Sequence, residues 1–191
     1  MSTPNAPNPD VNPSASPVAM PKEPSSEVLL IQRMSVKYDG VEDRIALDIT
    51  DALGRVARLW LTRHGTDIMV RTTAAGVESY ATAQLTQAKV APSDANQIRE
   101  SALATQQLTA RLTQRNASKV ELPPGTTEHL VTGFAMPPSK GGIQLDFMCK
   151  PEVKARVVLQ SAELFQWLSA LQRQYKKAGW AMAVWPHWIG Q

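Results

Sequence analysis

Positively charged side chains and one tryptophan alternate with apolar residues along strand-like stretches in both halves of the chain. Lys and Arg can contact phosphates while an exposed indole stacks on a base, and proteins hold single-stranded nucleic acids with this combination. An ordinary solvated face carries similar charge patterns. The pattern therefore marks candidate partner-binding residues without selecting one chemistry. They are Arg33, Lys37, Arg58 and Trp60 in the first half, and Lys154 and Arg156 in the second.

Three of the five tryptophans lie close together near the end of the chain, at Trp180, Trp185 and Trp188. Tryptophan is enriched among the residues that dominate binding energy at protein interfaces, so one interpretation is a partner anchor. The other is a strap that folds back over the core, since ordered terminal segments are usually held by such contacts. We prefer the strap, and we keep Trp185 and Trp188 as candidate partner-binding residues.

The sequence contains no arrangement typical of an active site or a metal site. His64, His129 and His187 are far apart and lack the HExxH or HxxxH spacing of zinc sites. Cys149 is the only cysteine, so no disulfide can form within the chain. Gly141-Gly142 lies outside any phosphate-binding loop motif. We therefore predict no catalytic residue, no metal ligand and no cofactor, and we expect that the protein is not an enzyme.

The stretches that carry the charged residues occur twice. Residues 45–61 align with residues 143–159 at a constant offset of 98 positions without a gap, and six of the seventeen aligned pairs are identical. A constant offset that preserves the alternation of apolar residues indicates an internal duplication. We extend the same offset to the preceding strand-like stretches, where Phe134 and Met136 would correspond to Val36 and Tyr38.

Alternation within each copy predicts how its second and third strands pair. Placing Leu47 opposite Leu59 keeps the apolar residues of both strands on one face, and it sets Asp48 opposite Arg58 on the other face. A shift of one residue would move charges into the core, so the register is strongly specified. In the second copy the same pairing sets Asp146 opposite Arg156. The first copy begins with a strand near residues 28–38, and Asp39-Gly40 predicts a two-residue hairpin turn after it.

Three helices are expected. The first follows Thr62, a suitable N-cap, and runs toward Gln84. The second begins near Pro92 and ends near Asn116. The third begins with Ser161 as its cap, has an apolar stripe, and ends at Gly179. The second helix is expected to bury one stripe of side chains, namely Ile98, Thr105, Leu108 and Leu112.

These elements predict an α+β fold made of two duplicated strand-strand-strand-helix units. Each unit would be a small sheet with one helix across its apolar face, giving two layers related by a pseudo-twofold axis. Seven of the fourteen prolines lie in residues 1–25, which have little to bury, so we expect a disordered N-terminal tail there. The single domain, residues 26–191, would comprise repeat 1 (27–85), a helical insert (86–127), repeat 2 (128–179) and the Trp-rich strap (180–191).

The bulk properties are compatible with an ordinary globular protein of 191 residues and net charge +3. The charge is uneven, because residues 27–85 carry seven basic and eight acidic side chains, while residues 129–191 carry seven and three. The sequence has no signal-peptide pattern and no apolar run long enough to span a membrane. We expect a cytoplasmic protein that does not associate with membranes.

We interpret the chain as a non-catalytic interaction module, an accessory or adaptor protein that binds a protein partner. The alternative is a single-stranded nucleic-acid-binding protein that uses the open sheet face. A duplicated strand-rich unit followed by a helix resembles, in its layout, the Whirly and PUR-type single-strand binders, although those have four strands per unit where this chain has three. The resemblance rests on element order alone, since no motif matches residue by residue. The sequence assigns no oligomeric state.

Overall fold

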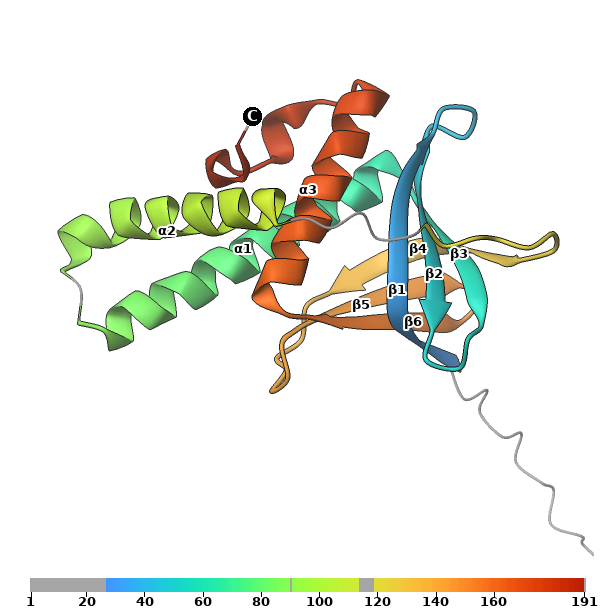
Figure 1. Cartoon of the computed structure of the whole chain (residues 1–191), viewed down its shortest axis with the longest axis horizontal. Coiled ribbons are helices and arrows are strands. Elements are labelled where there is room, and N and C mark those ends of the chain that lie inside the picture. The colour runs from blue at the N-terminus through green and yellow to red at the C-terminus, as the bar shows by residue number, and fades with distance from the viewer. Residues whose placement is uncertain (1–26, 90, 114–118, 191) are drawn as a thin grey trace, which may run out of the picture.

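The computed structural model describes residues 27–89, 91–113 and 119–190 (Figure 1). The predicted tail, residues 1–25, lies outside the described residues. The expected order of three strands followed by a helix occurs in both repeats. The elements are β1 (Glu27–Asp39), β2 (Arg44–Asp51), β3 (Val56–Leu61), α1 (Arg63–Gln87), α2 (Pro92–Leu112), β4 (Thr127–Ala135), β5 (Ile143–Lys150), β6 (Val153–Leu159), α3 (Ser161–Ala178) and the 3-10 helices η1 (Met182–Val184) and η2 (His187–Ile189).

The predicted two-layer arrangement is wrong. The six strands form one closed barrel in the order β1-β2-β3-β4-β5-β6, in place of two separate open sheets (Figure 1). Two parallel strand pairs join the repeats, β3 with β4 and β6 with β1. Separate three-stranded sheets would leave the edges of β1, β3, β4 and β6 unpaired, and such small sheets are marginally stable. Closure pairs these edges with each other.

The apolar faces of the two repeats meet inside the barrel. Ile45, Leu47 and Leu59 from repeat 1 and Leu145 and Phe147 from repeat 2 have no solvent-exposed surface. Because each face covers the other, neither needs a helix laid across it. The helices instead gather on one side of the barrel, where α3 packs against β1 and α1 packs against β4 (Figure 1).

The predicted register of the second and third strands is confirmed in both repeats. Leu47 pairs with Leu59, and Asp48 pairs with Arg58. In repeat 2, Asp146 pairs with Arg156. Alternation with a period of two residues was sufficient to specify these pairs, because any shift by one residue would expose the apolar set.

The offset of 98 positions fails in the first strand of each repeat. Met34 pairs with Ile49, whereas Phe134 pairs with Phe147, the equivalent of Ile49. In their pairing with β2 and β5, equivalent residues of β1 and β4 are therefore 100 positions apart, because the chain from Phe134 to Phe147 is two residues shorter than the chain from Met34 to Ile49. Both strands also contain a β-bulge at this same offset, between Ile31 and Arg33 in β1 and between Val131 and Gly133 in β4.

The expected two-residue hairpin at Asp39-Gly40 is also wrong. Asp39 is the last residue of β1 and pairs with Arg44, so the connection spans residues 40–43. The Asp39 Oδ1 atom accepts hydrogen bonds from the backbone N–H groups of Val41 and Glu42, at 3.0 and 3.3 Å. These bonds stabilise a wider turn, as aspartate side chains commonly do.

The ends of α1 and α3 mostly follow the sequence signals. Thr62 is the N-cap of α1, and its hydroxyl accepts a hydrogen bond from the N–H of Gly65 at 3.1 Å. Gly179 ends α3 in the left-handed conformation, with φ of 65°. The cap of α3 is Gln160 rather than Ser161, because the Gln160 N–H donates to the Glu163 carboxylate at 2.8 Å. None of the described helices is long and apolar enough to cross a membrane.

The apolar stripe that we predicted to be the buried side of α2 faces solvent. Ile98, Leu108 and Leu112 are 42, 57 and 79% exposed. The buried side of α2 carries Leu103, Gln107 and Ala110, and it packs against α3. Periodicity correctly predicted a helix, but it could not identify the buried side because both sides carry apolar residues.

Candidate interaction surfaces

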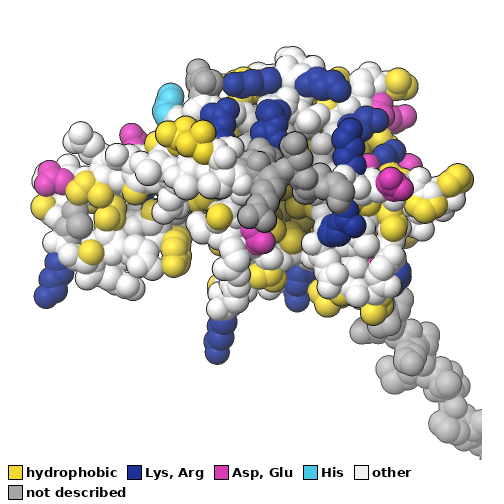
Figure 2. Space-filling view, in the orientation of Figure 1, with side chains coloured by type: hydrophobic (Ala, Val, Ile, Leu, Met, Phe, Trp, Pro, Cys, Tyr) yellow, Lys and Arg dark blue, Asp and Glu magenta, His cyan; other side chains and the backbone are white. Residues whose placement is uncertain are grey.

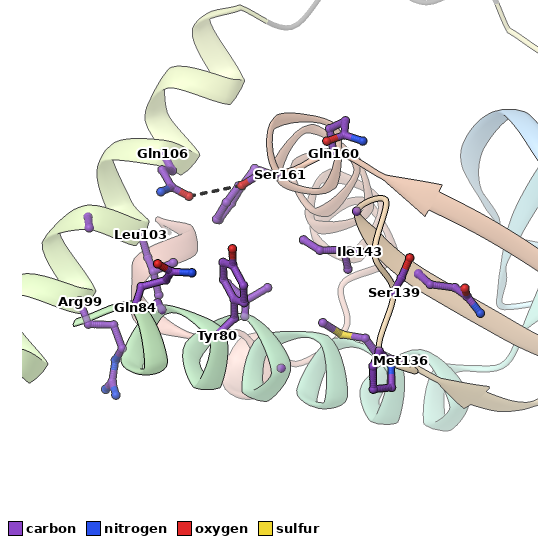
Figure 3. A pocket seen from close by; sticks show the side chains of 18 of the residues that line it. Tyr80, Gln84, Arg99, Leu103, Gln106, Met136, Ser139, Ile143, Gln160 and Ser161 are labelled. Atoms are coloured by element: carbon purple, nitrogen blue, oxygen red, sulfur yellow. Dashed lines mark hydrogen bonds between the residues drawn. The ribbon is translucent and has the colours of Figure 1, made fainter. Parts of the chain in front are cut away.

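A groove separates the α1–α2 helical pair from the β4–β5 connection and the first turn of α3 (Figure 3). Its cavity has a volume of about 760 Å³. Tyr80 projects from α1 into this space and is 67% exposed. We call it the α1–α2 groove. Its apolar lining includes Val77, Tyr80, Ala81 and Leu85 from α1, Ala102 and Leu103 from α2, Met136, Pro137, Pro138 and Ile143 around the β4–β5 connection, and Phe165 from α3.

Two glycines allow the walls of the groove to approach each other. A Cβ atom at Gly76 would lie 2.6 Å from the Met136 methyl carbon, so glycine in the middle of α1 lets Met136 pack against that helix. A Cβ atom at Gly142 would lie 2.7 Å from the carbonyl oxygen of Leu159. The Gln160 side chain also donates to the carbonyl of Gly141 at 2.9 Å. These contacts hold the β4–β5 connection in place as one wall.

The rim of the groove is polar and carries positive charge. Among the described residues, none that lines the groove is an aspartate or glutamate, whereas Arg99 and Lys140 both line it. Arg99 donates to the Thr82 hydroxyl at 3.1 Å. Four side-chain amides complete the rim, and one of them, Gln106, accepts a hydrogen bond from Ser161 at 3.5 Å (Figure 3). The groove therefore combines an apolar interior with a rim suited to an anionic group.

Two of the predicted binding residues of repeat 1, Arg58 and Trp60, contact each other on the outer barrel surface. Arg58 donates two hydrogen bonds to the buried Asp48 carboxylate, at 2.7 and 3.1 Å. This hydrogen bonding raises the pKa of Arg58 above its ordinary value. The Arg58 guanidinium also lies 5.0 Å from the centre of the Trp60 ring, and the Trp60 indole N–H donates to Glu128 at 2.8 Å. One face of the Trp60 ring is therefore already in contact with a cation.

In repeat 2 the equivalent carboxylate binds more partners. Asp146 accepts hydrogen bonds from Arg156 at 2.8 and 3.0 Å, and it pairs with Lys154 at 2.8 Å. The Gln144 side chain donates to it at 3.0 Å. Hydrogen bonding from Arg156 is the largest of the effects that lower the pKa of Asp146 to about 2. Lys154 and Arg156 are thus engaged in an ion-pair cluster.

Barrel closure separates the residues that the sequence analysis grouped into one open face. Arg58 and Trp60 lie on the outer surface of repeat 1, whereas Lys154 and Arg156 lie on that of repeat 2. Each cluster belongs to a different sector of the barrel wall, because the repeats occupy successive strands of one closed sheet. The two clusters do not form a common surface.

Arg33 and Lys37 are exposed on β1, the strand against which α3 packs. The Tyr38 N–H donates to the Gln174 side chain at 2.9 Å, which places α3 beside this strand. Figure 2 shows Lys and Arg side chains gathered over α3 and β1. We call this the α3–β1 basic surface. Its exposed residues are Arg33, Lys37, Arg173, Lys176 and Lys177.

The C-terminal tryptophans pack as a strap. Trp180, Trp185 and Trp188 are 5–6% exposed. The rings of Trp180 and Trp185 stand edge-on to Tyr175 of α3, with centroids 5.0 and 5.3 Å away. Trp188 contacts Phe165 in the same manner at 5.6 Å. In this structure the candidate residues Trp185 and Trp188 are covered and contribute no exposed binding surface.

The histidines and the cysteine are scattered. His64 and His187 are exposed, while His129 is buried in β4. Cys149 is buried in β5, and burial raises the pKa of its thiol to about 11, so the thiol stays protonated. Within the described part of the chain, no group of three or more His, Cys, Asp or Glu side chains is placed to hold a metal ion.

Comparison with known proteins identifies no relative. No protein-family model, no curated protein and no solved structure matches the chain significantly. The likeness to Whirly and PUR-type proteins thus remains one of element order.

Sequence reasoning missed the groove entirely, because its walls come from four segments that are distant in the chain. The signals that did exist were Gly76 within a helix and the Pro137-to-Gly142 connection.

Proposed function

We propose that this protein is a non-catalytic interaction module that binds an amphipathic segment of a protein partner in the α1–α2 groove. The observation that carries the proposal is the open apolar cavity of about 760 Å³, with the ring of Tyr80 67% exposed at its wall. Cavities of this size are within the range of binding sites in proteins. A large exposed aromatic side chain is also the residue type that most often anchors an interface.

The shape of the groove favours a segment of polypeptide. The groove runs between two helices and a loop, and amphipathic helices commonly bind by placing apolar side chains into such grooves. Its interior can accept apolar side chains beside Tyr80, Leu85 and Phe165, while the rim amides can bond to backbone or polar groups. The described lining contains Arg99 and Lys140 and no carboxylate, which favours a partner segment with acidic residues beside its apolar ones.

A matched pair of variants on α2 tests the proposal. Ala102 is exposed and lines the groove, whereas Ala104 is also exposed on the same helix and is not among the residues that line it. Ala102→Glu should block the groove by its bulk and repel an acidic segment, and Ala104→Glu should do neither. Both changes place a good helix former on an exposed site, so both proteins should keep wild-type stability.

The measurement has two parts. Anilinonaphthalene sulfonate, an apolar ring system with one negative charge, serves as a direct fluorescent probe of the groove. Immobilised wild-type protein and the two variants are then used to capture proteins from the native host. The proposal is supported if the dye and the captured partners bind wild type and Ala104→Glu equally and bind Ala102→Glu at least about tenfold more weakly. A tenfold loss corresponds to about 1.4 kcal/mol of binding free energy. Equal binding by all three proteins contradicts it.

Single-stranded nucleic acid remains the second candidate, because the α3–β1 basic surface concentrates positive charge. The sheet face of Arg58 and Trp60 supports it less well, since Arg58 contacts both Asp48 and the Trp60 ring. A nucleic-acid binder should co-purify with absorbance at 260 nm and lose affinity steeply as salt increases. Lys176→Glu with Lys177→Glu should remove that binding. If partners bind through the groove, added salt should weaken their capture much less than Ala102→Glu does.

A further inference from the structure

The duplication extends into the helices α1 and α3. Their N-caps, Thr62 and Gln160, lie 98 positions apart, the same offset that relates residues 45–61 to residues 143–159. Every buried residue of α1 has a buried counterpart in α3 at this offset. The pairs are Thr66 with Leu164, Met69 with Trp167, Val70 with Leu168, Thr73 with Leu171, Ala74 with Gln172 and Val77 with Tyr175. The two helices therefore pack on the barrel in equivalent ways.

The contacts of these helices with the end of the first strand of each repeat are equivalent as well. The Met136 side chain lies where a Cβ atom of Gly76 would come within 2.6 Å of it, and the Gln174 side chain accepts a hydrogen bond from the Tyr38 N–H at 2.9 Å. Gly76 corresponds to Gln174, and Met136 to Tyr38, at the offset of 98. The α1–α2 groove, which Met136 lines, therefore has a counterpart between α3 and the β1–β2 connection.

Trp180 fills this counterpart site. Its ring stands edge-on to those of Tyr38 and Tyr175, with centroids 5.8 and 5.0 Å away. The indole N–H donates to the Asp43 carboxylate at 3.0 Å. The residues at the three equivalent positions beside the α1–α2 groove are Met136, Val77 and Gly141. The first two line the groove, and the third lies between two lining residues. The chain itself thus places an aromatic side chain in a site of this geometry.

The different ends of the two helices explain why only one site is filled in this way. Gly179 ends α3 in the left-handed conformation, and the chain turns so that Trp180 returns to Tyr175. The equivalent residue of α1 is Ala81, and that helix continues to Gln87. Glycine adopts the left-handed conformation readily, whereas alanine favours continuation of a helix. The helix α1 therefore carries the chain onward at the point where α3 releases a tryptophan.

The lining of the α1–α2 groove also suits an aromatic ring. Tyr80 and Phe165 lie on its walls, and aromatic rings pack favourably edge-on or offset against each other. The thioether of Met136 adds a sulfur atom, which contacts aromatic rings favourably. Figure 3 shows Tyr80 and Met136 on walls that come from different parts of the chain.

The connections that border the two sites differ in charge. The β1–β2 connection carries Glu42 and Asp43, and Asp43 accepts the hydrogen bond from Trp180. The equivalent residues of the β4–β5 connection are Lys140 and Gly141, and Lys140 lines the groove. A ring that enters the groove therefore meets a cation where Trp180 meets an anion. An acidic group beside the ring complements this charge.

We propose that the partner segment anchors in the α1–α2 groove through an aromatic side chain with an acidic residue beside it, as Trp180 fills the counterpart site. The proposal rests on the proposed function, since it names the side chain that enters the same groove. The ring contacts Met136 and Tyr80, and the acidic group pairs with Lys140.

The test uses three small probes on the full-length chain. Indoleacetate combines an aromatic ring with a negative charge, cyclohexylacetate has the charge without the aromatic ring, and tryptamine has the ring with a positive charge. Binding is followed by nuclear magnetic resonance of isotope-labelled methionine methyl groups, and the Met136 signal is identified by its loss in Met136→Leu. An aromatic ring beside this methyl group shifts its signal through the ring current. Cyclohexylacetate is measured by displacement of indoleacetate.

Indoleacetate should shift the Met136 signal saturably and bind about threefold or more tightly than either other probe, because it alone offers both the ring and the charge. Lys140→Glu places the residue type of Glu42 at the equivalent position and should reverse the preference between indoleacetate and tryptamine. Lys150→Glu is the matched control, since Lys150 is exposed on β5 and is not among the lining residues, and it should leave the preference unchanged.

Two outcomes would overturn this proposal while the proposed function stands, provided that Ala102→Glu still weakens capture of partners. One is equal affinity for cyclohexylacetate and indoleacetate, or no saturable shift of the Met136 signal with any probe, which removes the aromatic anchor. The other is a probe preference that Lys140→Glu leaves unchanged, which removes the acidic neighbour. Dye and partner binding that is unaffected by Ala102→Glu would remove the groove as a site, and both proposals with it.

Discussion

The two repeats of this protein share an interior and differ on their surfaces. In both, the second and third strands pair in the same register and set an aspartate opposite an arginine. Outside, Trp60 in repeat 1 corresponds to Val158 in repeat 2, and the residue paired with Arg58 on the next strand is Glu128, whereas the residue paired with Arg156 is Leu30. Interior positions must fill one shared, closely packed volume, so they tolerate little change. Surface positions away from such packing can diverge at small cost in stability.

The repeats also hold their paired carboxylates differently. Among the described residues, Asp48 is held by the cation of Arg58, whereas Asp146 contacts both Arg156 and Lys154. In the first cluster the Trp60 ring also contacts Arg58, and in the second the Gln144 side chain donates a hydrogen bond to Asp146. The same strand geometry thus supports two different polar networks, and this difference can be measured.

The largest expected effect comes from equivalent core residues. Leu47→Ala and Leu145→Ala should each destabilise the protein by about 2–5 kcal/mol, because both side chains are fully buried in one interior. Denaturant unfolding followed by circular dichroism and by tryptophan fluorescence measures this. Each variant should show one transition that coincides for both signals. Two separated transitions, with each variant shifting only one of them, would mean that the repeats fold as independent units.

Removing the paired arginines should affect the repeats unequally. Arg58→Ala leaves the buried Asp48 without its cation and should cost about 1–3 kcal/mol, as for other buried groups that lose a charged partner. Arg156→Ala should cost less, because Lys154 still contacts Asp146 at 2.8 Å. Urea unfolding of both variants at neutral pH gives the comparison. A loss for Arg156→Ala equal to that for Arg58→Ala would show that Lys154 does not compensate.

Acid should weaken the repeat 2 cluster. The pKa of Asp146 is about 2 in the folded protein, below the value of about 3.9 in an unfolded chain. A lowered folded pKa contributes stability that is complete above about pH 4 and is lost as the pH falls toward 2, with an amplitude of roughly 2 kcal/mol. Asp146→Asn should remove this part of the pH dependence. Unfolding free energies of wild type and variant between pH 2 and 6 test it, and parallel curves would contradict it.

The smallest effect is expected from making the repeat 1 surface like that of repeat 2. Trp60→Val places the residue type of Val158 at the equivalent position and removes the ring beside Arg58 and the hydrogen bond to Glu128. The cost should be about 1 kcal/mol, because these contacts lie near solvent. Thermal unfolding of Trp60→Val beside Val158→Ala checks this. A loss above that of Leu47→Ala would show that Trp60 belongs to the core.

The candidate site could be predicted from the sequence much less well than the strands could. The basic residues and Trp60 were recognisable because their side chains alternate with apolar ones, yet closure divided them between two barrel sectors. The α1–α2 groove was not recognisable, since Tyr80, Ala102 and Met136 become neighbours only when the helices fold back beside β4. The buried positions of α2 were missed because Leu103 and Gln107, rather than the longer stripe of apolar residues, face α3.

The sequence by itself determined the features that depend on residues close together in the chain. Alternation set the register that brings Asp48 opposite Arg58, and the signals at Thr62 and Gly179 set helix ends, because each rests on local backbone geometry. Only the tertiary structure decided that β3 pairs with β4 and β6 with β1, which turned two expected sheets into one barrel. Edge strands carry unpaired backbone groups that any other edge can satisfy, so their partners depend on how the repeats and the intervening helices pack together.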